Sequence, residues 1–304
     1  MTETTSPTLP PDTSPQQGTD FLYSLRIFMR NLTRNKIGFI GTLMIIAFII
    51  LAFVMPQFVP KEIKADVTKI YEPPSKEHPL GTDSQGKDIW AQIVHGGADI
   101  LTMAFLTGII ATFIGVTLGS LSAVVGGALD SLLTTLADIW LTIPRFPLLA
   151  VLAGMMQLDS TVTLALILAI LSWAGLYRAI RAQVFSIKER DYIEAAVALD
   201  LGLRHIIFSE ILPNMMAYIA INFTLAMTGA IYAQVGLVFL GLVPLRRNWG
   251  VMINLAWTQG AIFFKDSIYF IMAPVTAIAL FQLSIVWMSR SLEEIFNPRL
   301  RAGR

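Results

Sequence analysis

The sequence contains no cysteine and little charge. Among its 304 residues there are no Cys and three His, and Asp, Glu, Lys and Arg together make up 14%. The missing cysteines exclude a disulfide framework, a cysteine nucleophile and a cysteine-ligated metal. The scarcity of charge argues against a disordered chain. Because 22 basic and 21 acidic residues nearly cancel, no overall basic field would attract nucleic acid.

Apolar residues, in contrast, are abundant. They make up 55% of the chain, and the mean hydropathy is +0.64. A soluble domain is roughly 45–50% apolar and roughly a quarter charged. A single soluble domain has too little interior to bury this much apolar surface, so the composition predicts a membrane protein and argues against a soluble enzyme.

Long apolar runs support this prediction. A membrane-spanning helix needs about 20 mostly apolar residues. Six stretches are candidates, which predicts an all-α polytopic protein: residues 37–55, 100–125, 131–156, 161–177, 215–245 and 268–289. A seventh stretch, residues 250–264, is shorter and contains Asn254 and Gln259. We interpret it as an interfacial or re-entrant segment.

The ends of the chain suggest an orientation. The start is rich in Pro, Thr, Ser and Gln and lacks the pattern of a cleaved signal peptide. Four basic residues precede the first span, Arg26, Arg30, Arg34 and Lys36, which predicts a cytoplasmic N-terminus. With six spans the C-terminus is also cytoplasmic. The expected organisation is a disordered tail (1–24), a basic segment with the first span (25–58), an extracytoplasmic loop (59–98), a five-span core (99–290) containing the cytoplasmic segment 178–213, and a cytoplasmic tail (291–304).

The segment 192–202 is the most informative part of that cytoplasmic region. Its Ala, Glu and Leu residues favour a helix, Gly202 can end it, and Pro213 interrupts the next one. Two short helices joined by a turn are therefore expected. Ala195 and Ala196 make a flat face beside the carboxylate of Glu194, which would suit a docking surface. An ordinary amphipathic connector with a solvated Glu explains the same pattern.

This segment resembles the EAA loop of ABC-importer permeases. Glu194-Ala195-Ala196 and Leu212-Pro213 match that motif at the expected spacing, whereas the family glycine is replaced by Asp200. Asp tolerates a left-handed backbone better than most residues, and Gly202 follows two positions later. The resemblance implies that an ATPase subunit docks on a set of six residues: Tyr192, Glu194, Ala195, Ala196, Asp200 and Gly202.

A second motif, His78-Pro-Leu-Gly-Thr-Asp-Ser-Gln-Gly-Lys-Asp88, narrows the resemblance. It resembles the HPLGTDxxGRD signature of the dipeptide, oligopeptide and nickel permease group, specifically its C-type subunit, with Lys87 in place of the usual Arg. The resemblance extends from about residue 25 to the end of the chain. Asn297 stands where that group commonly has Asp.

The same loop contains a pattern close to that of a phosphate-binding loop. Gly81-x4-Gly86-Lys87 is followed by Asp88, whereas such a loop needs Ser or Thr there to hold magnesium. ATP binding by this chain is therefore not expected. The glycines and Pro79 are instead predicted to shape a compact turn that leads into the second span. We interpret His78 as a loop or interface residue and not as a metal ligand. The three histidines, His78, His95 and His205, are divided between the two faces of the membrane, which argues against a histidine cluster for nickel or zinc.

Two further patterns lie within the spans. Small residues recur every fourth position along the second span, at Ala111, Gly115, Gly119 and Ala123. They predict close helix–helix packing, within this chain or with a partner; a substrate path is the minor alternative. In the fifth span Asn222 and Gln234 suit hydrogen bonds between helices or, by analogy with the family, a pathway lining.

The third span carries two charges, Asp138 and Arg145, with Pro144 and Pro147 beside the arginine. Seven residues are about two helical turns, so the two charges would lie on one face about 10 Å apart without pairing directly. Charged residues within a span usually face a cavity or each other, and a proline bend would suit a pathway lining. Alternatively, Arg145 lies near the outer interface and extends its charged end to water.

The resemblance implies a transport subunit without enzymatic activity in the inner or plasma membrane. It would form half of a translocation pathway for a peptide-like or other small solute. The implied partners are a homologous second permease, two ABC ATPase subunits and an extracytoplasmic binding protein. ATP and Mg would be bound by the ATPases, and no cofactor by this chain.

The alternative is a secondary transporter driven by an ion gradient. Such folds often show internal repeats and intramembrane ionisable groups. The sequence shows no clear repeat, and Asp138 and Arg145 are its main intramembrane charges.

Overall fold

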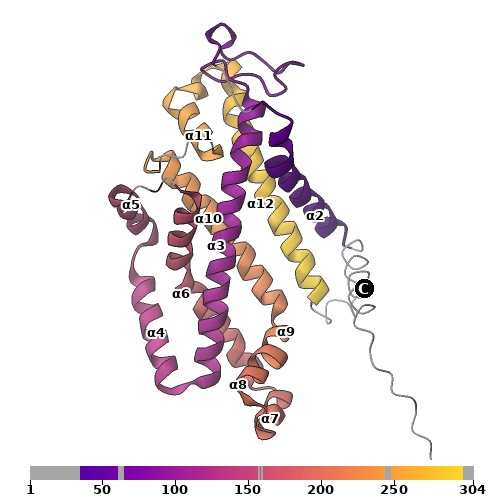
Figure 1. Cartoon of the computed structure of the whole chain (residues 1–304), viewed down its shortest axis with the longest axis vertical. Helices are drawn as coiled ribbons and strands as arrows, with labels where there is room; N and C mark the ends of the chain where they lie inside the picture. Colours follow the sequence, from indigo (N-terminus) through magenta and orange to yellow (C-terminus); the bar gives the residue numbers. More distant parts are fainter. Residues whose placement is uncertain (1–34, 61–64, 157, 159, 244–247, 297–304) are drawn as a thin grey trace, which may run out of the picture.

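The computed structural model is an elongated bundle of helices (Figure 1). It describes residues 35–60, 65–156, 158, 160–243 and 248–296, and only the backbone over 293–296. Residues 1–34 and 297–304 lie outside this part, and with them the predicted tail 1–24, Arg26, Arg30, Arg34 and Asn297. The described residues form helices and loops, with one isolated bridge between Thr82 and Asp88. The all-α prediction is confirmed.

The elements follow one another in a simple order. They are α2 (Lys36–Ile49), η1 (Ile50–Val54), η2 (Met55–Gln57), η3 (Val67–Lys69), α3 (Ile89–Val125), α4 (Gly127–Thr142), α5 (Arg145–Met155), α6 (Thr161–Lys188), α7 (Asp191–Ala198), α8 (Gly202–His205), η4 (Ile206–Ile211), α9 (Leu212–Asn214), α10 (Met216–Phe239), α11 (Trp249–Thr258), η5 (Ala261–Phe263), η6 (Lys265–Ser267) and α12 (Ile268–Phe296).

The helices match the predicted spans in number and order. In the described part of the chain, five helices are long and apolar enough to cross a membrane, or six if the bent pair α4 and α5 counts as one span. α3 begins before its apolar run, at Ile89, and α6 continues beyond its own run to Lys188. Hydropathy marks the part of a helix inside lipid, and polar turns extend the helix outside it.

The third span differs from its prediction. Residues 131–156 were expected to form one helix, but α4 ends at Thr142 and α5 begins at Arg145, with a bend of 78° between them. Pro144 lacks an N–H group and disfavours a helical backbone at the residue before it. Ile143 is accordingly extended, with φ −76° and ψ 122°.

Packing places the elements around α3. This long helix lies along α6 and also contacts α10, whereas α2 lies along α12. Close approach of α2 to α12 depends on glycine: a Cβ atom added to Gly41 would lie 2.6 Å from Cβ of Trp287. The loop before α3 and the short helix α11 are at one end of the bundle, and α7, α8 and α9 are at the other (Figure 1).

Candidate functional site

The segment that resembles the EAA loop forms a compact turn of short helices, α7 to α9. We call residues 191–214 the hook. α7 ends in a Schellman motif, in which the N–H of Asp200 donates to the carbonyl of Val197 at 3.0 Å and the N–H of Leu201 to that of Ala196 at 3.2 Å. Asp200 has φ +50° and occupies the position that this motif usually gives to glycine. The next helix begins at Gly202, with φ +76°.

The inner face of the hook is part of the protein core. Ile193 and Ala196 are 1% and 4% exposed, and they pack in a cluster with Ile180, Val184 and Ile187 of α6. The prediction that Ala196 forms part of an open docking face is therefore wrong. On α7, Ala195 is exposed whereas Ala196 is buried, because neighbouring residues lie about 100° apart around the helix axis.

The outer face of the hook carries the other members of the predicted docking set. Tyr192, Glu194, Ala195, Asp200 and Gly202 are all exposed. Sequence reasoning missed the apolar side chains that accompany them: Val197, Leu199, Leu201, Leu203 and Phe208, of which Leu199 is 72% and Phe208 65% exposed. The sequence feature that could have identified them is the presence of large apolar residues in a connector that also contains Glu, Asp and Arg. Exposed apolar patches mark interaction sites.

The small-residue stripe of α3 lies against α6. Ala111, Gly115, Gly119 and Ala123 are all buried. A Cβ atom added to Gly115 would lie 2.7 Å from Cβ of Leu176, and one added to Gly119 would lie 3.0 Å from the backbone nitrogen of Arg181. The stripe thus packs two helices of the same chain, as the first alternative supposed.

The two charges of the third span have separate partners on α6. Asp138 Oδ1 lies 3.6 Å from Nη1 of Arg178, and both side chains are more than half exposed. Arg145 donates through Nη2 to the carbonyl of Leu168, at 3.4 Å, and to the hydroxyl of Ser172. The expectation that Asp138 and Arg145 share one helix face is wrong, because the bend at Ile143 and Pro144 separates them.

The polar residues of the fifth span lie inside the fold. Asn222 donates to the carbonyl of Tyr218 in its own helix, at 2.9 Å, and among the described residues this side chain makes no bond to another helix. Gln234 is fully buried, and its amide has no hydrogen-bond partner in the described part of the chain. Because both side chains are buried, neither presents a polar group on the surface of the chain that could line a pathway.

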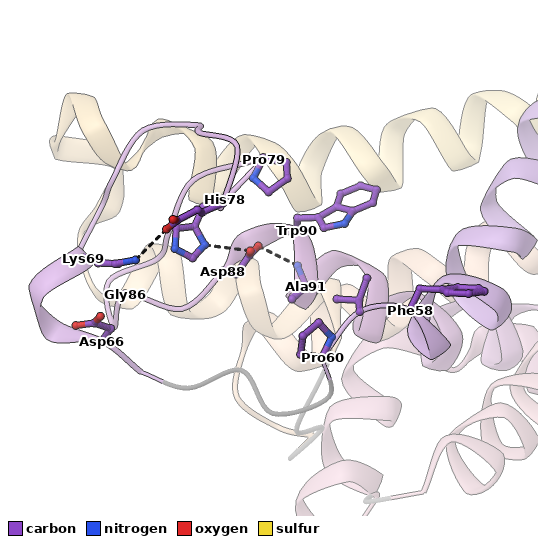
Figure 2. A pocket seen from close by; sticks show the side chains of 12 residues that line it. Phe58, Pro60, Asp66, Lys69, His78, Pro79, Gly86, Asp88, Trp90 and Ala91 are labelled. Carbon is purple, nitrogen blue, oxygen red and sulfur yellow. Dashed lines mark hydrogen bonds and ion pairs between the residues drawn. The ribbon is translucent and has the colours of Figure 1, made fainter.

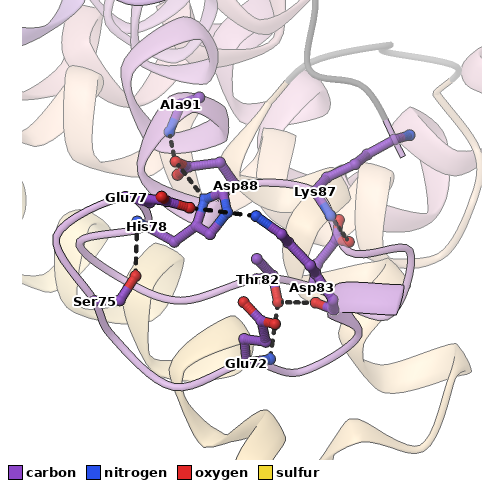
Figure 3. A network of polar contacts seen from close by, with 10 residues as sticks. Glu72, Ser75, Glu77, His78, Thr82, Asp83, Lys87, Asp88 and Ala91 are labelled. Atoms are coloured by element: carbon purple, nitrogen blue, oxygen red, sulfur yellow. Dashed lines mark hydrogen bonds and ion pairs between the residues drawn. The ribbon is translucent and has the colours of Figure 1, made fainter. Parts of the chain in front are cut away.

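Hydrogen bonds among the residues of the second motif hold the loop before α3 in a compact shape (Figure 3). The buried carboxylate of Asp83 accepts bonds from the backbone of Gln85 and Lys87, at 2.7 and 2.9 Å. Nδ1 of His78 lies 3.1 Å from Asp88, and Asp88 also caps α3 by accepting from the N–H of Ala91. The structure therefore gives the motif a role in shaping the loop.

The predicted compact turn is present in this loop. Gly81 and Gly86 have φ of +76° and +70°, a region that other residues rarely adopt. A Cβ atom on Gly86 would also lie 1.8 Å from the carbonyl oxygen of Asp66.

An open pocket of ≈ 450 Å³ lies beside this loop (Figure 2). On its wall Lys69 and Glu77 form an exposed ion pair at 3.3 Å. Thr68 donates from its backbone and hydroxyl to Asp66, at 3.0 and 2.6 Å, and these bonds hold the pKa of Asp66 below its usual value. Among the described residues, no group of three His, Asp or Glu side chains could hold a metal ion.

Comparison with known proteins agrees with this arrangement. Residues 115–302 match the model of the family described as binding-protein-dependent transport system inner membrane component. Residues 24–74 match the N-terminal TM domain of oligopeptide transport permease C. These two matches cover the hook and the first span, respectively.

Individual relatives are similar over most of their length. A putative peptide permease protein of Brucella suis is 30% identical over 269 residues, covering 88% of each chain. The oligopeptide transport system permease protein OppC of Bacillus subtilis is 28% identical over 276 residues, covering 88% of this chain and 87% of the relative. The dipeptide transport system permease protein DppC of the same organism is 29% identical over 229 residues, covering 74% and 71%. With its apolar crossing helices, its hook and these matches, the chain belongs to the binding-protein-dependent inner-membrane permease family of ABC transporters.

Proposed function

We propose that this chain is a permease subunit of an ATP-driven importer, and that ATPase subunits dock on the outer face of the hook. The observation that carries the proposal is the combination of Glu194 with exposed apolar side chains at an end of the bundle. The hook begins three residues after α6 ends at Lys188, so these side chains lie outside the stretch that lipid would cover. A protein partner would bury them and gain the hydrophobic stabilisation.

The orientation follows from the basic residues. Arg178, Arg181, Lys188, Arg190 and Arg204 precede or lie in the hook, and basic residues favour the cytoplasmic side. The hook and both termini are then cytoplasmic. The hydrogen-bonded loop within residues 59–98 and the segment 246–267 are then extracytoplasmic, and a binding protein would deliver the solute on that side.

A peptide is the proposed solute, because the relatives are named as peptide, oligopeptide and dipeptide permeases. This chain would form half of the pathway, and a homologous permease the other half. Asp138 and Arg145, on either side of the bend, remain candidates for its lining; Asn222 and Gln234, which are buried, do not. ATP and Mg would be held by two separate ATPase subunits, which would also carry out the hydrolysis.

Affinity purification from the native membrane in mild detergent tests this proposal. Two ATPase chains and a second permease are expected to purify with this chain, and the complex should hydrolyse ATP faster when peptide and binding protein are added. A chain that purifies alone and supports gradient-driven uptake in vesicles would instead identify a secondary transporter.

A further inference from the structure

α4 is attached to the rest of the molecule by a polar face and by a small apolar cluster, in which Ala137 packs with Ala174 and Tyr177 of α6. In this helix, which the structure describes throughout, Ala137 alone is buried. Large apolar residues cover the exposed side: Leu129, Leu132, Leu136, Ile139 and Leu141. The described contacts of α4 are with α6 and α3. The few side chains that join α4 to these helices therefore decide whether it moves with them.

The strongest of these connections is an ion pair between Asp130 and Arg181. Nε of Arg181 lies 2.5 Å from Oδ1 of Asp130, and Nη2 lies 2.6 Å from Oδ2. Ser122, at the end of α3, donates to the same carboxylate at 2.5 Å. Bidentate charge-assisted bonds of this kind fix orientation as well as distance. Three helices meet at this one carboxylate.

A tyrosine extends the connection along the α4–α6 contact. The hydroxyl of Tyr177, which is fully buried, lies 2.7 Å from Oγ of Ser122 and 3.0 Å from Oγ1 of Thr134. We call Ser122, Asp130, Thr134, Tyr177 and Arg181 the clamp.

The clamp and the neighbouring pair of Asp138 and Arg178 together fix how α4 is set against α6. Asp130, Thr134 and Asp138 are spaced four residues apart and therefore lie on one face of α4. Their partners Arg181, Tyr177 and Arg178 lie within a short stretch of α6. Sliding or rolling α4 along α6 would break all three contacts together.

On its other side the clamp is continuous with the hook. α6 runs as one helix from Tyr177 through Arg181 to Lys188, whose Nζ donates to the carbonyl of Ala123 at 3.1 Å. Ile187 of α6 and Ile193 of α7 belong to the same buried cluster. A displacement of the hook therefore acts on a helix that is fastened to α4.

We propose that the clamp makes α4 and α6 move as one unit, so that Asp130 and Arg181 carry movement of the hook to α4 and to the bend at Ile143 and Pro144. They are positioning residues that need not touch the solute. This inference rests on the proposed function for the source of the movement. The fastening of α4 to α6 does not depend on it.

The fastening can be measured directly, because a chain without cysteine accepts spin labels at chosen sites. Ser131→Cys on α4 and Ala182→Cys on α6 are both exposed positions. In the full chain in lipid nanodiscs, we expect a narrow distance distribution between the two labels. Asp130→Asn should broaden it, whereas Asp266→Asn, at an exposed position far along the chain in η6, should leave it unchanged. An equally narrow distribution in Asp130→Asn would overturn the inference.

The coupling role is measured in the assembled transporter. We expect Asp130→Asn to lower the solute moved per ATP hydrolysed about tenfold, the change that about 1.4 kcal/mol produces, without lowering the amount of complex. Asp130→Glu, which keeps the charge, should recover part of the loss. An unchanged ratio in Asp130→Asn would refute the positioning role.

Two further outcomes are also decisive. If Asp130→Asn does not accumulate in the membrane, Arg181→Lys, which keeps the charge and loses the bidentate contact, is measured in its place with the same expectations. If no ATPase associates with the unaltered chain, the proposed function and the coupling role both fail, while the label distances still decide whether the clamp fastens α4 to α6.

Discussion

Asp200 holds a left-handed backbone at the end of α7, in the position where a Schellman motif usually has glycine. A side chain in this region costs energy that glycine avoids. We expect Asp200→Gly to raise the free energy of unfolding by about 0.5–1 kcal/mol. Gly202→Ala should lower it by about 1 kcal/mol, because Gly202 has φ +76° although the space around it is open. Thermal unfolding of the detergent-solubilised chain measures both, and shifts of the same sign would contradict the assignment.

The two alanines of the hook differ in what surrounds them. Ala196→Leu would overpack the cluster that includes Ile180 and Ile193 and should destabilise the chain by about 1–3 kcal/mol. Ala195→Leu changes an exposed position and should leave the unfolding temperature unaltered while weakening association with the ATPase subunits. Unfolding curves and the amount of copurified ATPase separate the two effects. Loss of stability in Ala195→Leu would mean that the hook packs differently.

At the scale of elements, the contact of α3 with α6 requires glycine where their backbones approach. Gly115→Leu should destabilise the chain by at least about 1–3 kcal/mol, because its Cβ alone would overlap Leu176. Gly175→Ala is the control: its added methyl meets nothing within 4 Å, and alanine favours a helix by about 0.5–1 kcal/mol over glycine. Unfolding temperatures should thus change in opposite directions. A Gly115 variant as stable as the unaltered chain would show that the helices can move apart at no cost.

The bend between α4 and α5 shows how far an element can be predicted. Pro144 and Pro147 indicated a disturbance within residues 131–156, but hydropathy alone could not distinguish a kink from a break. The angle of 78° depends on where α5 finds contacts. Phe146 lies against Gly236 of α10, with 3.1 Å between its Cε2 and an added Cβ, and Arg145 bonds to α6. These partners are distant in sequence.

At the scale of the whole molecule, the proposed role of the hook is to transmit ATP-driven movement to the membrane helices. Glu194→Lys reverses a charge on its exposed face, so we expect normal insertion but at least about a tenfold loss of peptide uptake, since unpairing an interfacial charge costs several kcal/mol. Asp266→Lys, the same reversal of sign at an exposed position in η6, is the matched control for insertion. Uptake into vesicles and ATP hydrolysis are measured together. Uptake that survives Glu194→Lys would remove this residue from the docking contact.

The sequence by itself determined the class of the molecule, because hydrophobic length and composition depend on the residues of each segment alone. The two motifs, at the hook and before α3, could also be recognised without a structure, since each combines particular side chains with fixed spacing. The stripe of small residues on α3 predicted close helix packing, although the sequence did not identify the partner helix. Local pattern was enough for these features because the physics behind them acts within a few helical turns.

Tertiary structure decided which side chains remain available. Ala196 and Gln234 are buried although the sequence offered them as contacts, and Asp138 pairs with Arg178 instead of sharing a face with Arg145. The bond between Asp130 and Arg181 joins residues 51 positions apart, so no local pattern could reveal it. Burial and pairing depend on which helices meet, and that is set by the packing of the whole bundle.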